Sequence, residues 1–134
     1  VYDTFSRLRR EGYVRVEKHD HQIYISLTEE GRKKAGRFQI DSLHIQKPKR
    51  WDGKWRVVLF DIENSKNIKR DSLRGKLKEL GFYLYQKSVW VHPYQCDDEI
   101  KMLRDFFGLV KKEICLIVAE KIANEKILRD YFKL

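Results

Sequence analysis

The first apolar positions of the chain have the spacing of a helix. Val1, Phe5 and Leu8 recur at i, i+4 and i+7, and the arginines of residues 7–10 mostly face elsewhere. This spacing is typical of an amphipathic helix with a basic outer side. Gly12 follows at the position where glycine commonly terminates a helix, so we expect the helix to end there.

The next apolar residues alternate with polar ones, as in β-strands. Residues 13–17 and 22–27 show this alternation, and the polar turn 18–21 separates them. Thr28 is then a suitable N-cap for a second helix, because two glutamates follow in its first turn. The first 37 residues are therefore predicted to form a helix, a two-stranded hairpin and a second helix.

The second part of the chain opens with a nearly continuous apolar run, which is typical of a buried strand. The pattern then predicts the order strand, helix, two strands, helix, strand and a last helix, over residues 55–62, 73–80, 82–84, 87–92, 97–107, 113–119 and 121–133. We expect the strand 113–119 to be buried. We expect the last helix to turn Leu128, Tyr131 and Phe132 inward. The first six elements follow the ferredoxin-like (βαββαβ) plan.

The composition of the chain favours a polyanionic binding partner. The 134 residues include 29 Lys and Arg against 20 Asp and Glu, a formal net charge of +9, which favours nucleic acid. The excess is spread over both halves, so a solvated basic surface remains an alternative. No apolar run approaches the roughly 18 residues that span a bilayer, and no signal-peptide pattern is present. The two cysteines lack metal-site or disulfide spacing, so we expect a cytoplasmic protein without a membrane partner.

A basic segment, residues 47–54, joins the two parts. Lys47, Lys49 and Arg50 lie beside Trp51 and could grip a nucleic-acid backbone. The segment could equally be a docked linker whose indole packs on the next domain. Its proline and its Asp-Gly pair favour extended and turn geometry.

The series RLRREGYVRVEKHDHQIYISLTEEGRKKA resembles the back half of a winged helix-turn-helix. In such domains the first of these helices lies in the DNA major groove and the wing reaches toward phosphate or the minor groove. The resemblance implies that double-stranded DNA is contacted by five residues, which are Arg7, Arg10, His19, His21 and Gln22. For each of them the alternative is a side chain that is simply exposed to solvent, on the helix face or at the hairpin tip. The two helices that precede the recognition helix in this family are missing, and because the chain begins with Val rather than Met we expect a preceding portion.

The series KPKRWDGKWRVVLFDI and RDSLRGKLKELGFYLYQKSVWVHPY resemble the central domain of PaaX-type transcriptional regulators. That domain in turn resembles CRISPR-associated protein two (Cas-two), a small nuclease. The matching features are a first strand ending in Asp61, a helix closing on L-x-x-x-G-F, and a Q-x-S-V-W strand. The resemblance implies an α+β chain, made of a partial winged helix (1–46), a basic linker (47–54) and a ferredoxin-like, Cas-two-like domain (55–134).

The Cas-two resemblance also implies a possible chemistry. There Asp61 would be the catalytic carboxylate and metal ligand, paired across a homodimer to hold Mg²⁺ or Mn²⁺ and activate a water. Arg70 and Ser88 would orient a phosphate or ligand. The alternative is that Asp61 caps the loop into the next helix, near Asn64 and Ser65.

Three functions stay open from the sequence. The first is a dimeric, DNA-binding regulator of PaaX type, which requires no cofactor. PaaX-type regulators respond to a small acyl-coenzyme A and carry a further C-terminal domain, which is missing here, so we do not expect effector binding. The second is a metal-dependent endonuclease or CRISPR-adaptation protein of Cas-two type. The third is a dimerisation module with a vestigial wing, and the sequence alone does not decide whether the chain is an enzyme.

Overall fold

The computed structural model describes residues 2–134, without the side chains of residues 2, 3 and 5, and has two compact units that divide after Ser42. The chain is a mixed α and β protein with one sheet in each unit. Two side chains of the predicted first helix face, those of Val1 and Phe5, lie outside the described residues. We describe each unit by itself.

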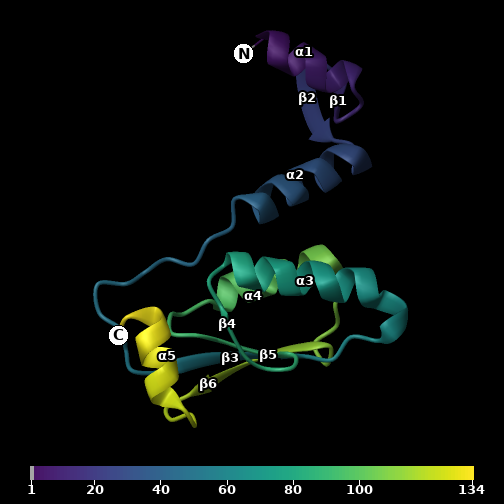
Figure 1. Ribbon diagram of the computed structural model, residues 1–134. Coiled ribbons are helices and arrows are strands. Elements are labelled where there is room, and N and C mark those ends of the chain that lie inside the picture. Colours follow the sequence, from purple (N-terminus) through teal and green to yellow (C-terminus); the bar gives the residue numbers. More distant parts are fainter. Residues whose placement is uncertain (1) are drawn as a thin grey trace. The chain divides into compact units, whose positions relative to one another are not determined.

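The first unit has the predicted order of helix, hairpin and helix (Figure 1). Its elements are α1 (Tyr2–Arg10), β1 (Val14–His19), β2 (Gln22–Leu27) and α2 (Glu29–Asp41). The two strands pair antiparallel in one continuous register. Thr28 is the N-cap of α2, as predicted, because its Oγ1 accepts a hydrogen bond from the Gly31 amide at 3.0 Å.

The first unit buries few side chains. Val14 and Ile40 are its buried apolar residues among those described, and every residue of β2 is exposed. Ile23 and Ile25 keep 66% and 55% of their surface accessible. The hairpin therefore presents apolar side chains that nothing within this unit covers.

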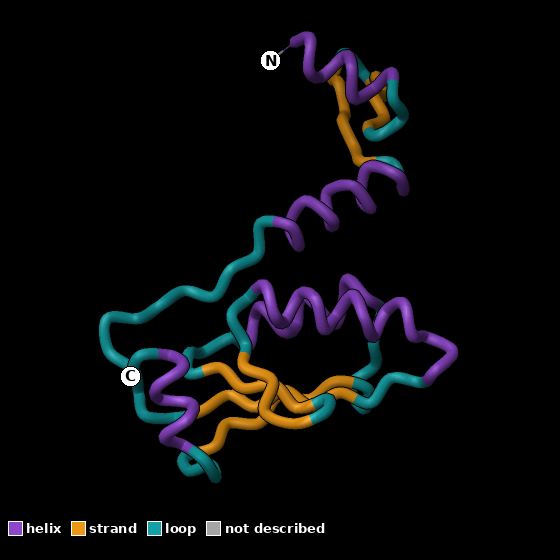
Figure 2. Tube along the Cα trace, in the orientation of Figure 1, coloured by secondary structure: helices purple, strands orange, loops and turns teal. Residues whose placement is uncertain are grey.

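The second unit follows the predicted order of strands and helices. Its elements are β3 (Trp55–Phe60), the 3₁₀ helix η1 (Asn64–Lys66), α3 (Asn67–Glu79), β4 (Tyr83–Gln86), β5 (Val89–His92), α4 (Asp97–Phe107), β6 (Ile114–Ala119) and α5 (Glu125–Phe132). The strands form one sheet in the order β4-β5-β3-β6, and every neighbouring pair is antiparallel. Figure 2 shows the strands of this sheet in orange. The most apolar strand, β3, is thus an inner strand.

Helices α3 and α4 cover one face of this sheet (Figure 1). The predicted helix face of Leu73, Leu77 and Leu80 is fully or almost fully buried there. On the opposite face, Leu128 of α5 packs in a cluster with Trp55 and Val91. The sheet is thus the middle layer between α3 and α4 on one side and α5 on the other.

Two expectations about burial are wrong. Tyr131 does not point inward, because 55% of its surface is accessible, whereas Leu128 on the same helix is buried. Strand β6 is not a buried strand, because it is at the sheet edge and leaves Ile117 and Val118 about half exposed, at 47% and 50%. An apolar run alone does not distinguish an inner strand from an edge strand.

Across the described part of the chain, none of the helices combines the length and the apolar character that crossing a bilayer requires.

Candidate functional site

The residues predicted to contact DNA lie on the surface of the first unit. Arg7 and Arg10 belong to the last turn of α1, and both are exposed. His19 and Gln22 form the last pair of the hairpin ladder. His19 is hydrogen-bonded to Glu17 at 3.1 Å, and Gln22 accepts a hydrogen bond from the Tyr24 hydroxyl at 2.8 Å. The hairpin end therefore holds its polar side chains in place through short local contacts.

The hairpin tip is a two-residue turn with an unusual backbone. Asp20 and His21 both have positive φ, at 49° and 67°, as in a type I′ turn, which Asn-Gly or Asp-Gly favours. A side chain other than glycine at such a position costs about 1 kcal/mol. The imidazole of His21 is exposed at this tip.

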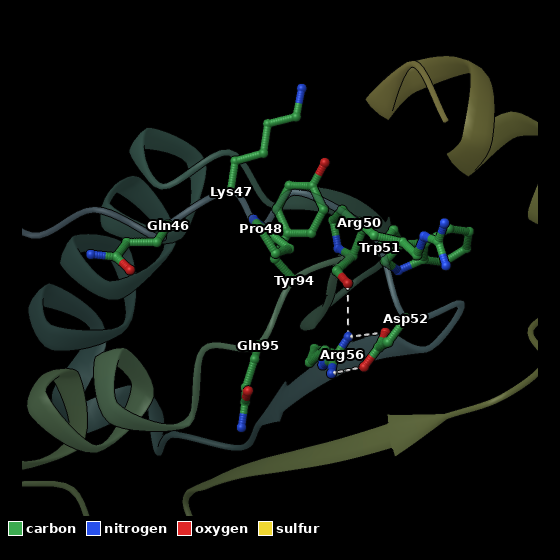
Figure 3. Close-up of a pocket in the computed structure, with 10 residues that line it drawn as sticks. Gln46, Lys47, Pro48, Arg50, Trp51, Asp52, Arg56, Tyr94 and Gln95 are labelled. Carbon is green, nitrogen blue, oxygen red and sulfur yellow. Dashed lines mark hydrogen bonds and ion pairs between the residues drawn. The ribbon is translucent and has the colours of Figure 1, made fainter.

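In the second unit, a buried arginine holds the basic segment against the sheet. Arg56 on β3 is 6% exposed, and its guanidinium donates to both carboxylate oxygens of Asp52 at 2.9 and 2.6 Å (Figure 3). It also donates to the carbonyl oxygens of Lys54 and Pro93, at 3.0 and 2.8 Å. One side chain thereby joins the segment before β3 to the residues after β5.

These contacts change the proton affinity of both partners. The hydrogen bonds from Arg56 lower the pKa of Asp52 to about 2, although burial opposes this shift, and the same bonds raise the pKa of Arg56. The pair is therefore charged at neutral pH. Sequence patterns did not reveal Arg56 as a site residue, although an arginine inside an apolar strand is itself a signal that a buried partner exists.

The contacts of Trp51 show that the basic segment is docked through its indole. Its indole ring lies 4.8 Å from the Trp55 ring, the guanidinium of Arg129 lies 4.9 Å from its centroid, and its Nε1 donates to the Lys54 carbonyl at 2.9 Å. The indole is thus packed on the second unit. Lys47 and Arg50 stay exposed and line a cavity of about 360 Å³ together with Tyr94 (Figure 3).

Lys49, which lies between Lys47 and Arg50 in the sequence, is also exposed. The segment is therefore docked through Trp51, and its three basic side chains face solvent, so the two alternatives are compatible.

Asp61 lies directly after β3, where the sequence places it, and its carboxylate is exposed. It lines a cavity of about 390 Å³ together with Lys66, Lys112 and Glu113. Its backbone amide donates to the Glu113 carbonyl at 2.9 Å. No hydrogen bond from Asn64 or Ser65 to this carboxylate is present in the described structure, so the capping alternative has no support either.

The surroundings of Asp61 do not fit a divalent cation within one chain. Two further carboxylates line the cavity, those of Glu63 and Glu113. Glu113 accepts from the Val110 amide at 3.0 Å and from Lys66 Nζ at 3.1 Å. These contacts lower the pKa of Glu113. Among the described residues, no group of three His, Cys, Asp or Glu side chains could hold a metal ion, and two lysines line the cavity instead.

Arg70 and Ser88 are not brought together with Asp61 in one cavity. Arg70 Nη1 donates to Asn64 Oδ1 at 3.0 Å, which ties it to the loop before α3. Ser88 lies in the β4–β5 turn with φ of 64°, and its carbonyl accepts from the Phe60 amide at 3.3 Å. Ser88 lines a different cavity, together with residues of α3.

Comparison with known proteins places these features in a family. The family described as the PaaX protein central Cas2-like domain matches residues 48–127. The match extends over more than half of the chain, and it includes the basic segment from its proline, the Arg56–Asp52 pair and Asp61. The chain belongs to the PaaX family. No curated protein matches it.

Family membership accounts for the second unit of the chain. The matched PaaX region begins in the segment that Arg56 and Trp51 hold to the sheet and extends into α5. The first unit, with its hairpin and basic helix end, precedes the match. The PaaX-type resemblance of the second unit is therefore confirmed, and the wing remains a prediction from the residues.

Proposed function

We propose that this chain is a DNA-binding transcriptional regulator of PaaX type that binds duplex DNA through its first unit. The observation that carries the proposal is the exposed hairpin between two helices, in a chain of the PaaX family. In a winged helix, α1 would enter the major groove and the tip around His21 would reach the backbone or minor groove. Arg7 and Arg10 would make the groove-side contacts.

The distribution of charge supports a second contact surface. Residues 1–42 contain nine Lys and Arg against seven Asp and Glu, whereas residues 43–134 contain twenty against thirteen. Most of the excess charge thus belongs to the Cas2-like unit. We propose that Lys47, Lys49 and Arg50 contact phosphates and strengthen binding without reading sequence.

We propose a ferredoxin-like fold and a homodimer for the second unit. The order β4-β5-β3-β6 with all-antiparallel pairing supports the ferredoxin-like plan. Helix α5 packs on Trp55 and Val91, and the same face continues into an apolar strip of Leu59, Val89 and Ile117. Ile117 is 47% exposed. A second copy covering this strip would join two chains, each with its own hairpin, as dimeric regulators require.

The nuclease alternative is not favoured. Two lysines and two glutamates line the cavity with Asp61, and one of the glutamates is salt-bridged to a lysine. The family match is to a regulator's domain. We derive no metal-dependent step for this chain. A regulator of this type acts in the cytoplasm and needs no cofactor.

The test compares two pairs of substitutions that remove the same charge. One variant of the full chain carries Arg7→Ala and Arg10→Ala, and the control carries Lys121→Ala and Lys126→Ala. All four side chains are exposed. Affinity for a labelled duplex is measured by fluorescence anisotropy at fixed salt.

We expect the Arg7 and Arg10 variant to bind about tenfold more weakly or worse, because it loses two charge-assisted contacts. The control should stay within about threefold of the parent, since diffuse charge alone has a small effect. Equal losses in the two variants would mean that binding depends on overall charge, and the proposed DNA contact through α1 would be wrong.

A further inference from the structure

A cavity between α3 and the β4–β5 hairpin is unrelated to the proposed DNA contacts. It measures about 510 Å³, and its lining residues are Arg74, Gly75, Lys78, Leu84, Lys87, Ser88 and Trp90. Small-molecule sites commonly have volumes of about 300–1,000 Å³. The size is therefore suitable for a small organic ligand.

Trp90 contributes a buried donor without a partner. Its side chain is 6% exposed, and its Nε1 has no hydrogen-bond acceptor among the described residues. The other two indoles differ, since Trp51 donates to the Lys54 carbonyl and Trp55 to Glu125, each at 2.9 Å. A buried indole N–H normally finds an acceptor. This Nε1 has almost no accessible surface, so it does not itself face the cavity, whereas other atoms of Trp90 line it.

Three cations surround the same cavity. Arg74 and Lys78 are one turn apart on α3, and Lys87 lies in the β4–β5 turn. None of the three forms an ion pair with a carboxylate within the part of the chain that the structure describes. Like charges at i and i+4 of a helix repel each other. An anion between α3 and the turn would relieve this repulsion and accept hydrogen bonds from all three.

Gly75 keeps the cavity open from the helix side. It lies inside α3, where glycine is about 1 kcal/mol less favourable than alanine. A Cβ built at this position meets no atom within 4 Å. No neighbouring atom therefore requires a glycine at this position. A glycine does, however, keep the helix side of the cavity beside Leu84 and Trp90 free of side-chain atoms.

We propose that this cavity binds a small amphipathic anion, whose apolar body lies on Leu84 and Trp90 and whose carboxylate or phosphate lies among Arg74, Lys78 and Lys87. The Trp90 indole is part of the apolar wall, and the signal of its buried N–H reports a ligand that packs against the ring. The Ser88 hydroxyl is within the same lining and supplies a further polar contact. The proposal does not depend on DNA binding, and either can fail without the other.

The test follows the indole N–H signals of the full chain by ¹H–¹⁵N NMR. The chain has three tryptophans, so three indole signals are expected, and single Trp→Phe variants assign them. Hexyl phosphate and hexanoate are the probes, and inorganic phosphate and hexanol are their controls without the apolar body and without the charge. The two probes distinguish a phosphate ligand from a carboxylate ligand.

We expect hexyl phosphate, hexanoate or both to shift the Trp90 signal at saturable concentration, with Trp51 and Trp55 unmoved. Gly75→Leu should fill the cavity and abolish the shift, and Gly75→Ala should change the affinity less than about threefold. Leucine and alanine are both better helix formers than glycine, so both variants should fold. Arg74→Gln with Lys78→Gln should weaken binding about tenfold, because two charged contacts are lost.

Several results would overturn the proposal. One is a Trp90 signal that neither probe shifts. Others are inorganic phosphate or hexanol acting as well as the probes, and a shift that survives Gly75→Leu. A Trp90 signal that moves with a DNA duplex but with neither probe would assign the three cations to nucleic acid instead.

Discussion

Arg56 and His92 are polar residues buried opposite each other on paired strands. Their Cα atoms are partners in the β3–β5 register, and each side chain is 6% exposed. His92 packs against the rings of Phe82 and Tyr94, at 5.0 and 5.5 Å, and its Nδ1 accepts from the Tyr94 amide at 3.1 Å. Burial is the main cause that lowers the pKa of His92 to about 4, and the charge of Arg56 adds to it. His92 is therefore neutral at pH 7 and structural.

The neutral His92 makes stability depend on pH. The unfolded imidazole has a pKa of about 6.5, and the folded one of about 4. The unfolded chain thus binds more protons between these values, so the free energy of unfolding should fall as the pH falls from about 6.5 to 4, by up to about 3 kcal/mol. Urea unfolding at pH 7, 5.5 and 4.5 measures it, with tryptophan fluorescence as the signal, since all three tryptophans lie after residue 42.

The matched variants are His92→Phe and His21→Ala. Replacing the buried ring should flatten the dependence on pH in this range, and replacing the exposed one should leave it unchanged. An unaltered dependence in His92→Phe would show that another group titrates on unfolding.

Gly31 determines how α2 joins the hairpin. A Cβ at this position would collide with the carbonyl oxygen of Tyr13 and lie 2.8 Å from its carbon. The same carbonyl accepts from the Thr28 amide at 3.0 Å. The glycine in LTEEG, residues 27–31 of the series that resembles a winged helix, therefore has a physical basis, because the start of α2 passes directly over the residue before β1.

We predict that Gly31→Ala separates α2 from the hairpin. Backbone atoms cannot yield as a flexible side chain does, so the cost should be about 3 kcal/mol or more. Hydrogen exchange of the β1 and β2 amides should accelerate, while the second unit keeps its protection. Gly75→Ala is the control, since its Cβ meets no atom. Unchanged exchange in Gly31→Ala would contradict the close approach.

The order of the elements could be predicted from sequence because each depends on local spacing. Leu73, Leu77 and Leu80 recur at helical spacing and are buried, and Thr28 caps α2 through its own neighbours. The exposure of β6 and of Tyr131 could not be predicted, because it depends on which strand is at the edge and how α5 lies. The unpartnered Trp90 indole and the Asp52 contact of Arg56 likewise arise only from tertiary packing.

At the scale of the molecule, we predict that the apolar strip of the sheet face forms the dimer. Ile117 and Val118 are adjacent on β6, about equally exposed, and point to opposite faces. Ile117→Lys should therefore yield a monomer, and Val118→Lys should leave the dimer intact. Sedimentation equilibrium of the full chain measures both. A parent chain that is monomeric at high concentration, or dissociation by Val118→Lys alone, would contradict this interface.

The most direct test of the central claim measures duplex binding and strand cutting on one preparation. The full chain and Asp61→Ala are titrated with labelled duplex DNA at several salt concentrations, with and without Mg²⁺ or Mn²⁺. We predict salt-sensitive binding with a log–log slope of about −4.5, as expected if about five cations contact phosphates. We also predict no cutting and no effect of Asp61→Ala. Metal-dependent cutting that disappears in Asp61→Ala, or the absence of any duplex binding, would contradict the account of a DNA-binding regulator.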